Sequence, residues 1–499
     1  MTLFRTLTLT STFALAAGPA LAELTPSEVW DDWQELLGRY GAEVTFDRTS
    51  NSGDDLSIIG MTARFPVTDG ASVMEIGTLT FEQNSDGSVS VVLPDELPLS
   101  IEIEGPDGEE GTIGFTFKQP GASLIASGDS ENLRYDFDYP TVEMTDFTIE
   151  GDDIPEDIPV TFTFAMSALK GFIELAGDDV RSYTSDSSLG ELVLDMDING
   201  ETPEEGDGTF NLSMKDLVQS TTGTIGRVSG EMTLAELIEA GTRQVGTGTH
   251  GEVTYELDVN SPDGSFQMAA AAVSGTINGR IDEGGIAYGG ETNDVTMSFS
   301  ASAMPLPPVS FRMAQSSGSL AIPLVPGEDP QGFQMGFAIR GLEIDDMLWG
   351  MIDPVGQLPR DPITILLSTD GQVTISDDFL DQDFLEDDSP DIPGTIESLN
   401  VNEMQITIAG ADLTGNAAFE FDNSVGMPMP AGIANLRLVG GNGLLDTLVG
   451  MGLVPEEQAM GARMMLGLFA RPGEGEDTLE SVIEMKEDGS ITANGQRIR

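Results

Sequence analysis

Residues 191–200 read ELVLDMDING, and this stretch decides the fold. The apolar residues at every second position from Leu192 to Ile198 alternate with Asp195 and Asp197, which is the period of a strand with one apolar face. Asn199-Gly200 follow as a dipeptide typical of hairpin turns. The stretch therefore predicts an amphipathic β-strand that ends in a turn.

The same alternation recurs from about residue 43 to residue 436. Short runs such as TARF, SVSVVL, VTFTFAM and EVTYELDV are separated by turn dipeptides. We read Asp86-Gly87, Asp263-Gly264, Asn278-Gly279 and Asp370-Gly371 as such turns. The pattern predicts a mainly β protein with an elongated antiparallel sheet, curled or barrel-like. Because each strand has one apolar face, the sheet must fold over, close or be covered.

A helix is expected at residues 23–42, before the β-rich body. Thr25 suits the N-cap, Pro26 the first turn and Glu28 the capping box, and Gly41 suits the end. Trp30 and Trp33 share one side of this helix, which predicts packing over an apolar surface.

Residues 437–499 predict a helical hairpin followed by a final β-hairpin. Leu444–Leu453 form the first helix and Pro455–Ala470 the second. Met464, Met465 and Phe469 either pack in the core or form a hydrophobic lid, since methionine suits adaptable apolar surfaces.

The body, residues 43–436, shows a faint internal similarity. Segments 113–144 and 264–297 both contain a strand, a small-residue strand with Ser-Gly, a tyrosine strand and a V-x-M strand. This order suggests two similar halves with a boundary near residues 240–250.

The N-terminus predicts export. Arg5 precedes an apolar run, and Ala20 and Ala22 form an A-x-A cleavage site, so residues 1–22 read as a signal peptide. We expect a periplasmic protein without a transmembrane segment, since no later stretch reaches roughly 18 uninterrupted apolar residues. With 0 Cys, no disulfide contributes to its stability.

The charge excludes one class of partner. The chain has 85 acidic and 21 basic residues and a formal net charge of -64, which disfavours nucleic acid and anionic lipid head groups. A solvated acidic surface of this kind suits a protein bathed in salt.

A calcium loop is the alternative interpretation of residues 195–206. Asp195, Asp197 and Asn199 fit the start of the EF-hand pattern, but Gly206 occupies the place of its bidentate Glu. A surface calcium site formed by Asp195, Asp197 and Glu201 stays open as an alternative to a plain hairpin.

Motifs for catalysis or cofactor binding are weak. The stretch GTGTHG at 246–251 fits G-x-G-x-x-G, a fingerprint that needs a strand before it and a helix after it. Here a helix-like segment precedes and a strand follows, so we expect a glycine-rich connection. His250 is the only histidine, which argues against a zinc cluster. We expect no cofactor and no enzyme activity, with paired carboxylates as the one chemistry left open.

The most distinctive stretch, LWGMIDPVGQLPRDPITILLSTDGQVTI, covers residues 348–375. Its three prolines stiffen a loop after Trp349, in which Asp353 and Asp361 could anchor Arg360. The loop is either a rigid corner or a site of interaction with a ligand.

Three segments carry a family resemblance: PSEVWDDWQELLGRYG, LWGMIDPVGQLPRDP and PGEGEDTLESVIEMKEDGSITANGQRI. Together they resemble a family of exported Gram-negative bacterial proteins known only as a domain of unknown function. The resemblance implies a periplasmic β-rich protein and carries over no catalytic residue. The tail with Asn494-Gly495 more distantly resembles AsmA-like envelope proteins, which are associated with lipid movement along β-lined grooves.

Two functions follow as expectations. The first is a periplasmic envelope protein that binds a lipid or other hydrophobic ligand along a β-lined groove. The second is an acidic, non-enzymatic scaffold that binds an unidentified protein partner or divalent cations. The alternation alone does not say whether the apolar face is open or filled.

Overall fold

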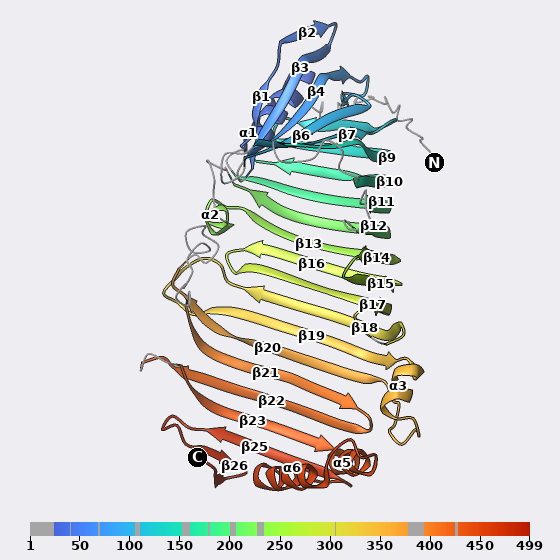
Figure 1. Ribbon diagram of the computed structural model, residues 1–499. Coiled ribbons are helices and arrows are strands. Elements are labelled where there is room, and N and C mark those ends of the chain that lie inside the picture. The colour runs from blue at the N-terminus through green and yellow to red at the C-terminus, as the bar shows by residue number, and fades with distance from the viewer. Residues whose placement is uncertain are drawn as a thin grey trace, which may run out of the picture.

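The computed structural model describes residues 24–39, 41–67, 70–104, 110–151, 160–177, 180–199, 206–226, 234–304, 306–377, 394–424 and 428–499. The expected signal peptide, residues 1–22, lies outside them. Of the described residues, 67% are in strands and 12% in helices, so the structure is mostly β. Figure 1 shows one long ladder of strands, with the N-terminal strands at one end and the C-terminal helices at the other.

The described strands form a single sheet of 27 strands in which every pairing is antiparallel. The prediction of a mainly β, elongated antiparallel sheet is therefore confirmed. The first strands are β1 (Glu43–Thr45), β2 (Arg48–Ser52), β3 (Asp55–Val67), β4 (Gly70–Gln83), β5 (Val89–Val92), β6 (Glu96–Glu104), β7 (Glu110–Lys118), β8 (Ser123–Asp129) and β9 (Asn132–Gly151).

The middle of the sheet contains several long strands and crosses residues 240–250 without a break in pairing. Its strands are β10 (Val160–Ala176), β11 (Arg181–Asn199), β12 (Asp207–Ile225), β13 (Arg243–His250), β14 (Val253–Ser261), β15 (Gly264–Ala272), β16 (Ser274–Asp282), β17 (Gly285–Ala301) and β18 (Val309–Ile322).

The C-terminal part continues the same up-and-down order past residue 436. Its strands are β19 (Gln331–Ile344), β20 (Ile363–Ile375), β21 (Gly394–Ile408), β22 (Ala411–Asp422), β23 (Met429–Val439), β24 (Arg471–Pro472), β25 (Thr478–Met485), β26 (Ile491–Ala493) and β27 (Gln496–Arg497).

The pairings close into a ring at two places, but neither ring is a true barrel. β13 and β14 follow one another along β12, and β15 and β16 follow one another along β17. Strands β5 and β6 on β4, and β7 and β8 on β9, repeat this arrangement. The two similar sequence segments, 113–144 and 264–297, occupy matching places in the two rings.

A line of backbone irregularities crosses the middle of the strands. Ala168 in β10, Asp216 in β12 and Asp294 in β17 have left-handed backbones, with φ of 53°, 52° and 52°. In β11, the strand between β10 and β12, Gly190 occupies the corresponding position. A Cβ at Gly190 would lie 3.2 Å from the Cβ of Ala168. The register is the same on both sides of these residues, so they change the direction of the side chains without adding a residue to one strand. We call this line the crease.

The crease changes which residues face the core. In β10 the apolar alternation through Met166 resumes at Leu169, one residue out of phase. Leu97 and Leu175 lie on opposite sides of the crease, yet both belong to the same buried cluster. The phase shift therefore keeps the apolar side chains of both halves of a strand on one face of the sheet.

Helix α1 (Pro26–Arg39) begins as predicted. The backbone N–H of Thr25 donates to Glu28 Oε2 at 2.9 Å, and the N–H of Glu28 donates to Thr25 Oγ1 at 3.4 Å, which is a capping box. Trp30 is buried against β4, where its ring lies 6.0 Å from the ring of Phe81. This packing covers the N-terminal end of the sheet.

The other described helices lie at the edges and at the C-terminal end of the ladder (Figure 1). Among the described residues, no helix is long and apolar enough to cross a membrane. The helices are α2 (Leu234–Glu239), α3 (Asp346–Ile352), α5 (Gly441–Gly450) and α6 (Glu456–Phe469).

Some glycine motifs were interpreted wrongly from the sequence. Asn278-Gly279 lies inside β16 and Asp370-Gly371 inside β20, so neither is a turn. A Cβ at Gly371 would lie 2.6 Å from the ring of Phe333, so this glycine serves close packing inside the sheet. The predicted connection at GTGTHG is also wrong, because its residues through His250 form β13.

Candidate functional site

One face of the sheet carries rows of uncharged side chains along its length, and we call it the apolar face. It follows from the strand register, because residues opposite one another in paired strands point to the same side. Two rows run from β9 to β25. The first contains Tyr135, Ile173, Ser185, Thr221, Gly246, Gly279, Tyr288, Leu320, Met335, Thr369, Val401, Ala417, Ala434 and Ile483. The second contains Phe137, Gly171, Ser187, Gln219, Gly248, Ile277, Gly290, Gly318, Phe337, Leu367, Met404, Gly415, Leu436 and Ser481.

A third row lies on the other side of the crease and is equally free of charge. Two of its aromatic rings, those of Phe117 and Phe164, lie with their centroids 6.4 Å apart. It contains Leu97, Phe117, Met144, Phe164, Leu194, Leu212, Tyr255, Ala270, Met297, Phe311 and Ile344.

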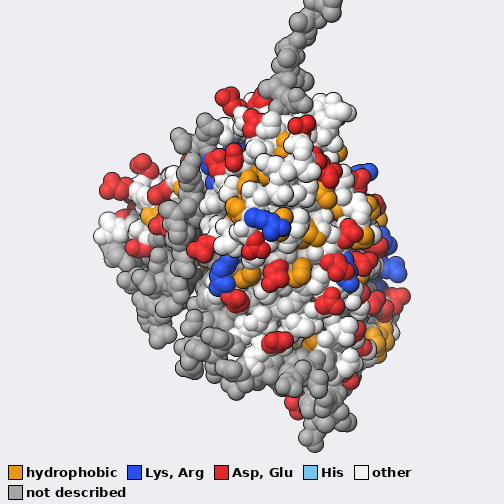
Figure 2. Space-filling model, turned by 90° about the horizontal axis from the view of Figure 1, so that it is seen from above, with side chains coloured by type: hydrophobic (Ala, Val, Ile, Leu, Met, Phe, Trp, Pro, Cys, Tyr) orange, Lys and Arg blue, Asp and Glu red, His pale blue; other side chains and the backbone are white. Residues whose placement is uncertain are grey.

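The opposite face of the same strands carries the charges. Arg134 and Glu174 pair across β9 and β10 at 2.6 Å, and Asp370 and Glu484 continue their row toward the C-terminus. Figure 2 shows acidic side chains spread over the N-terminal end of the molecule, with fewer basic ones among them. The sheet therefore separates a charged face from an uncharged one.

Large side chains on the apolar face are open to solvent. Tyr288 is 55% exposed, Met335 49% and Phe337 45%. Beside them, a Cβ added at Gly318 would meet no atom within 4 Å, so space remains above this strand. Contiguous exposed apolar surface is uncommon in monomeric soluble proteins and marks a site of interaction.

Helix α1 crosses the apolar face at its N-terminal end. The hydroxyl of Tyr135 donates a 2.6 Å hydrogen bond to Asp32 Oδ2, and Arg181 forms an ion pair with Asp32 Oδ1. Burial raises the pKa of Tyr135, and the negative charge of Asp32 raises it further. These contacts hold α1 across β9 and β11.

A cavity of about 750 Å³ lies between α1 and β8 to β13. Its walls combine aromatic and aliphatic side chains with uncharged polar ones. The lining residues are Trp33, Leu36, Leu124, Tyr135, Phe137, Tyr139, Leu169, Ile173, Leu175, Tyr183, Ser185, Gln219, Thr221, Ile225 and Gln244.

The C-terminal end of the apolar face lies next to α6. The carbonyl oxygen of Phe469 accepts hydrogen bonds from Ser481 Oγ at 2.6 Å and from Asn494 Nδ2 at 3.0 Å. Ser481 belongs to the second row, so the end of α6 lies over the apolar face. The N-terminus of α5 is held by Asp477, which accepts from the backbone N–H of Gly443 at 2.8 Å.

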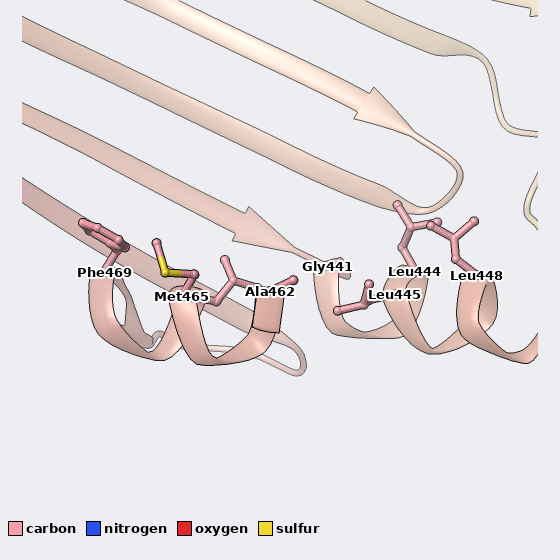
Figure 3. A pocket seen from close by; sticks show the side chains of 8 residues that line it. Gly441, Leu444, Leu445, Leu448, Ala462, Met465 and Phe469 are labelled. Atoms are coloured by element: carbon pink, nitrogen blue, oxygen red, sulfur yellow. The ribbon is translucent and has the colours of Figure 1, made fainter. Parts of the chain in front are cut away.

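The residues predicted as a hydrophobic lid lie on α6. Met465 and Phe469 line a cavity of about 430 Å³ between α5 and α6, together with Leu444, and Figure 3 shows them on the side of the helices that faces the strands. Met464 is outside this lining and is 73% exposed. The structure therefore joins two of the three lid residues in one cavity.

The predicted interaction loop is divided between a core and a cleft. Trp349 belongs to a small buried cluster against which Leu444 and Leu448 of α5 pack. Asp353 is also buried, and its Oδ2 accepts from the backbone N–H of Leu358 at 2.7 Å. Hydrogen bonds from the backbone of Gln357 and Leu358 lower the pKa of Asp353.

Arg360 does not bond the aspartates that the sequence suggested as its anchors. Its Nη1 lies 2.7 Å from Oδ1 of Asp346, the first residue of α3. Arg360 and Asp361 both line a cleft of about 490 Å³ that also includes Trp349. The rigid corner thus borders a charged cleft at the edge of the sheet.

The structure describes two of the three residues that were predicted to bind calcium. Asp195 and Asp197 lie in β11, opposite Asn211 and Thr209 of β12, and Glu201 lies outside the described residues. Within the described ranges, no three His, Asp or Glu side chains are grouped so that they could hold a metal ion. A calcium site remains a prediction.

Sequence reasoning missed the group of Asp32, Tyr135 and Arg181. One signal was present, because Asp32 falls on the apolar side of α1, three residues after Val29 and four before Leu36. An acidic residue in that position needs a buried partner, but the sequence cannot say which arginine supplies it.

Comparison with known proteins gives no relative: no protein-family model, curated protein or solved structure matches the chain.

Proposed function

We propose that the protein binds a lipid or another hydrophobic ligand along the apolar face. The observation that carries this proposal is the set of cross-strand rows without a charged residue, whose large side chains are about half exposed at β17 to β19. Burying such side chains gains about 25 cal/mol for each Å² of apolar surface removed from water. A hydrophobic ligand would supply that burial.

The dimensions of the face suit long molecules. The first row spans fourteen neighbouring strands from β9 to β25, and adjacent strands are about 4.8 Å apart, so the row is roughly 60 Å long. This is about twice the 30 Å hydrocarbon thickness of a bilayer. One ligand therefore covers only part of the face, or several lie along it.

The two ends are suited to hold such a ligand. Helix α1 is fixed over one end by the contact of Tyr135 with Asp32, and α6 over the other by the bonds to the Phe469 carbonyl. We assign Met465 and Phe469 to a cover at the second end. The charged opposite face keeps the loaded protein in water. Location in the periplasm belongs to the same proposal and follows from the predicted signal peptide.

Mass spectrometry of organic extracts tests the proposal. The mature chain, residues 23–499, is isolated without detergent from cells that export it, and a secreted protein of similar charge serves as the control. We expect co-purified lipid in molar proportion to the protein. An empty extract together with no binding of a hydrophobic dye to the native protein would overturn the proposal and favour a scaffold with protein or cation partners.

A pair of glycine variants locates the ligand. Gly318→Trp places an indole in the open space on the apolar face, and its backbone is not left-handed, so the fold should tolerate it. Gly332→Trp is the control on the charged face, since a Cβ at Gly332 meets only Gln372 Nε2, at 3.7 Å. We expect less bound lipid in the first variant and an unchanged amount in the second. Equal lipid content in both would place the ligand elsewhere.

A further inference from the structure

The cavity beneath α1 differs in chemistry from the rest of the apolar face. None of its lining residues carries a charge at neutral pH, although 21% of the chain is charged. Three of the six tyrosines in the chain, Tyr135, Tyr139 and Tyr183, line it together with Trp33. Burial raises the pKa of Tyr139, so its phenol is neutral as well. The cavity is therefore aromatic and uncharged.

One side of the cavity offers hydrogen bonds. Ser185, Gln219, Thr221 and Gln244 come from three neighbouring strands, β11, β12 and β13, and their side chains line the same space. We call these four residues the polar wall. Aliphatic residues of β10, among them Leu169 and Ile173, form the side toward β9.

The polar wall has unused hydrogen-bonding capacity. Gln219 Nε2 donates to Thr221 Oγ1 at 3.1 Å, and no bond of its side-chain carbonyl to another described residue is formed. Within the described part of the chain, the side chains of Ser185 and Gln244 also make no hydrogen bond to protein. These groups can form hydrogen bonds with a ligand at little cost in free energy, because the ligand replaces water as their partner.

A charged head group does not suit this cavity. Arg181, which contacts α1 through Asp32, is already paired, and an anion in this uncharged cavity loses hydration without gaining a cationic partner. The net charge of -64 opposes anions further. A cation would find no carboxylate in the lining.

We infer that this cavity selects an uncharged amphiphile with a hydroxyl- or amide-bearing head. The head lies against the polar wall, and the apolar tail passes over Ile277 and Tyr288 along the first two rows. Tyr135, Tyr139 and Trp33 contact the junction of head and tail, where side chains that are apolar with one polar atom fit best. This inference rests on the proposed function and adds its head-group specificity.

Binding of three probes with one chain length tests the inference. Delipidated mature protein is titrated at neutral pH with 1-monooleoylglycerol, oleate and oleoyl lysophosphatidylglycerol, each below its aggregation threshold. Binding is followed by calorimetry and by tryptophan fluorescence, because Trp33, one of the three tryptophans in the chain, lines the cavity. We expect 1-monooleoylglycerol to bind at least about tenfold more tightly than either anionic probe, because the anions are desolvated without a partner.

Variants of the polar wall identify the site. Gln219→Leu combined with Gln244→Leu keeps the side-chain size and removes the hydrogen bonds, so we expect about tenfold weaker binding of 1-monooleoylglycerol. Gln372→Leu, at an exposed position on the charged face, is the control and should bind like the wild type. Unfolding curves of the three proteins establish that the fold is retained.

The outcomes separate this inference from the proposed function. Equal affinity for all three probes, or a preference for an anion, would overturn the head-group inference and leave lipid binding intact. Unchanged affinity in the double variant would place the head group elsewhere and overturn it too. Failure of every probe and of a hydrophobic dye to bind would instead overturn the proposed function.

Discussion

The hydroxyl of Tyr135 donates a 2.6 Å hydrogen bond to the carboxylate of Asp32, and this bond ties a strand in the sheet to the helix that lies across it. The same carboxylate is paired with Arg181 of β11. One buried aspartate thus connects α1 to two strands, so the position of the helix over the apolar face depends on it.

Removal of the charge on Asp32 should destabilise the protein. Asp32→Asn leaves Arg181 buried without its counter-charge, and we expect the free energy of unfolding to fall by about 3 kcal/mol. Urea denaturation measures the loss. Glu102→Gln is the control, because it breaks the exposed pair with Arg64, whose atoms are 2.7 Å apart, and should cost less than about 1 kcal/mol. Similar losses in both variants would mean that Asp32 does not anchor the helix.

Alkaline pH should weaken the attachment of α1. Burial raises the pKa of Tyr135 in the folded protein above its usual 10.0, so the unfolded chain releases this proton first as the pH rises. The associated stability is fully present below pH 10.0 and is lost above it, as the pH rises toward the folded-state pKa. Tyr135→Phe should flatten the fall in unfolding free energy between about pH 9 and about pH 11. An unchanged slope would contradict this assignment.

The strained backbone at the crease predicts that two substitutions by glycine change the unfolding free energy in opposite directions. Ala168 has a φ of 53°, a conformation that costs an L-residue roughly 1 kcal/mol, so Ala168→Gly should raise the unfolding free energy by up to about that amount. Ala165, in the regular part of the same strand, is the control. Ala165→Gly should lower the unfolding free energy by roughly 0.5 to 1 kcal/mol. Thermal or urea denaturation that shows the same sign for both would argue against strain at the crease.

Asp477 should control the order of α5. Asp477→Ala removes the bonds to the backbone of Gly443 and to Asn442, and loss of such a cap costs about 1 kcal/mol. Hydrogen exchange in residues 441–450 should become faster, while exchange in α1 stays unchanged. Asp488→Ala, which removes a similar bond to Ser490 in a hairpin turn, is the control and should not affect α5.

Acid should act on α5 through the same residue. Burial alone would raise the pKa of Asp477, but the hydrogen bonds from Gly443 and Asn442 outweigh it and lower the pKa below the usual 3.8. Its contribution is therefore present above pH 3.8 and is lost as the pH falls through the lower folded-state value. Exchange in α5 should increase over that acidic range in the wild type, and the Asp477→Ala variant should lack this step.

Local patterns predicted most of the elements. Alternation such as that of residues 191–198 identified strands, and Thr25 with Glu28 fixed the start of α1, because these signals act within a few residues. The helical hairpin between residues 444 and 470 was predicted from apolar residues at helical spacing, which is also a local signal. The turn prediction failed at Asn278-Gly279 and Asp370-Gly371, which lie inside strands, and at Gly371 a Cβ would lie 2.6 Å from the ring of Phe333. A sequence does not show such cross-strand contacts.

The candidate site was predictable only in part. The existence of an apolar face follows from alternation, and the structure shows where it is exposed, at Tyr288 and Met335 for instance. The cavity beneath α1 brings Trp33 next to Gln244, which lies more than two hundred positions away, so no spacing rule could indicate it. The anchoring of Arg360 by Asp346 depended in the same way on the fold.

The register of the strands also determines how this protein could change in size. Each strand from β18 to β22 pairs with the strands that precede and follow it in the chain. Deletion or duplication of one hairpin, such as β21 with β22, therefore leaves its neighbours antiparallel. The uncharged face would lengthen or shorten by about 10 Å with each hairpin. Under the proposed function, ligand capacity would change in discrete steps while α1 and α6 remain at the two ends.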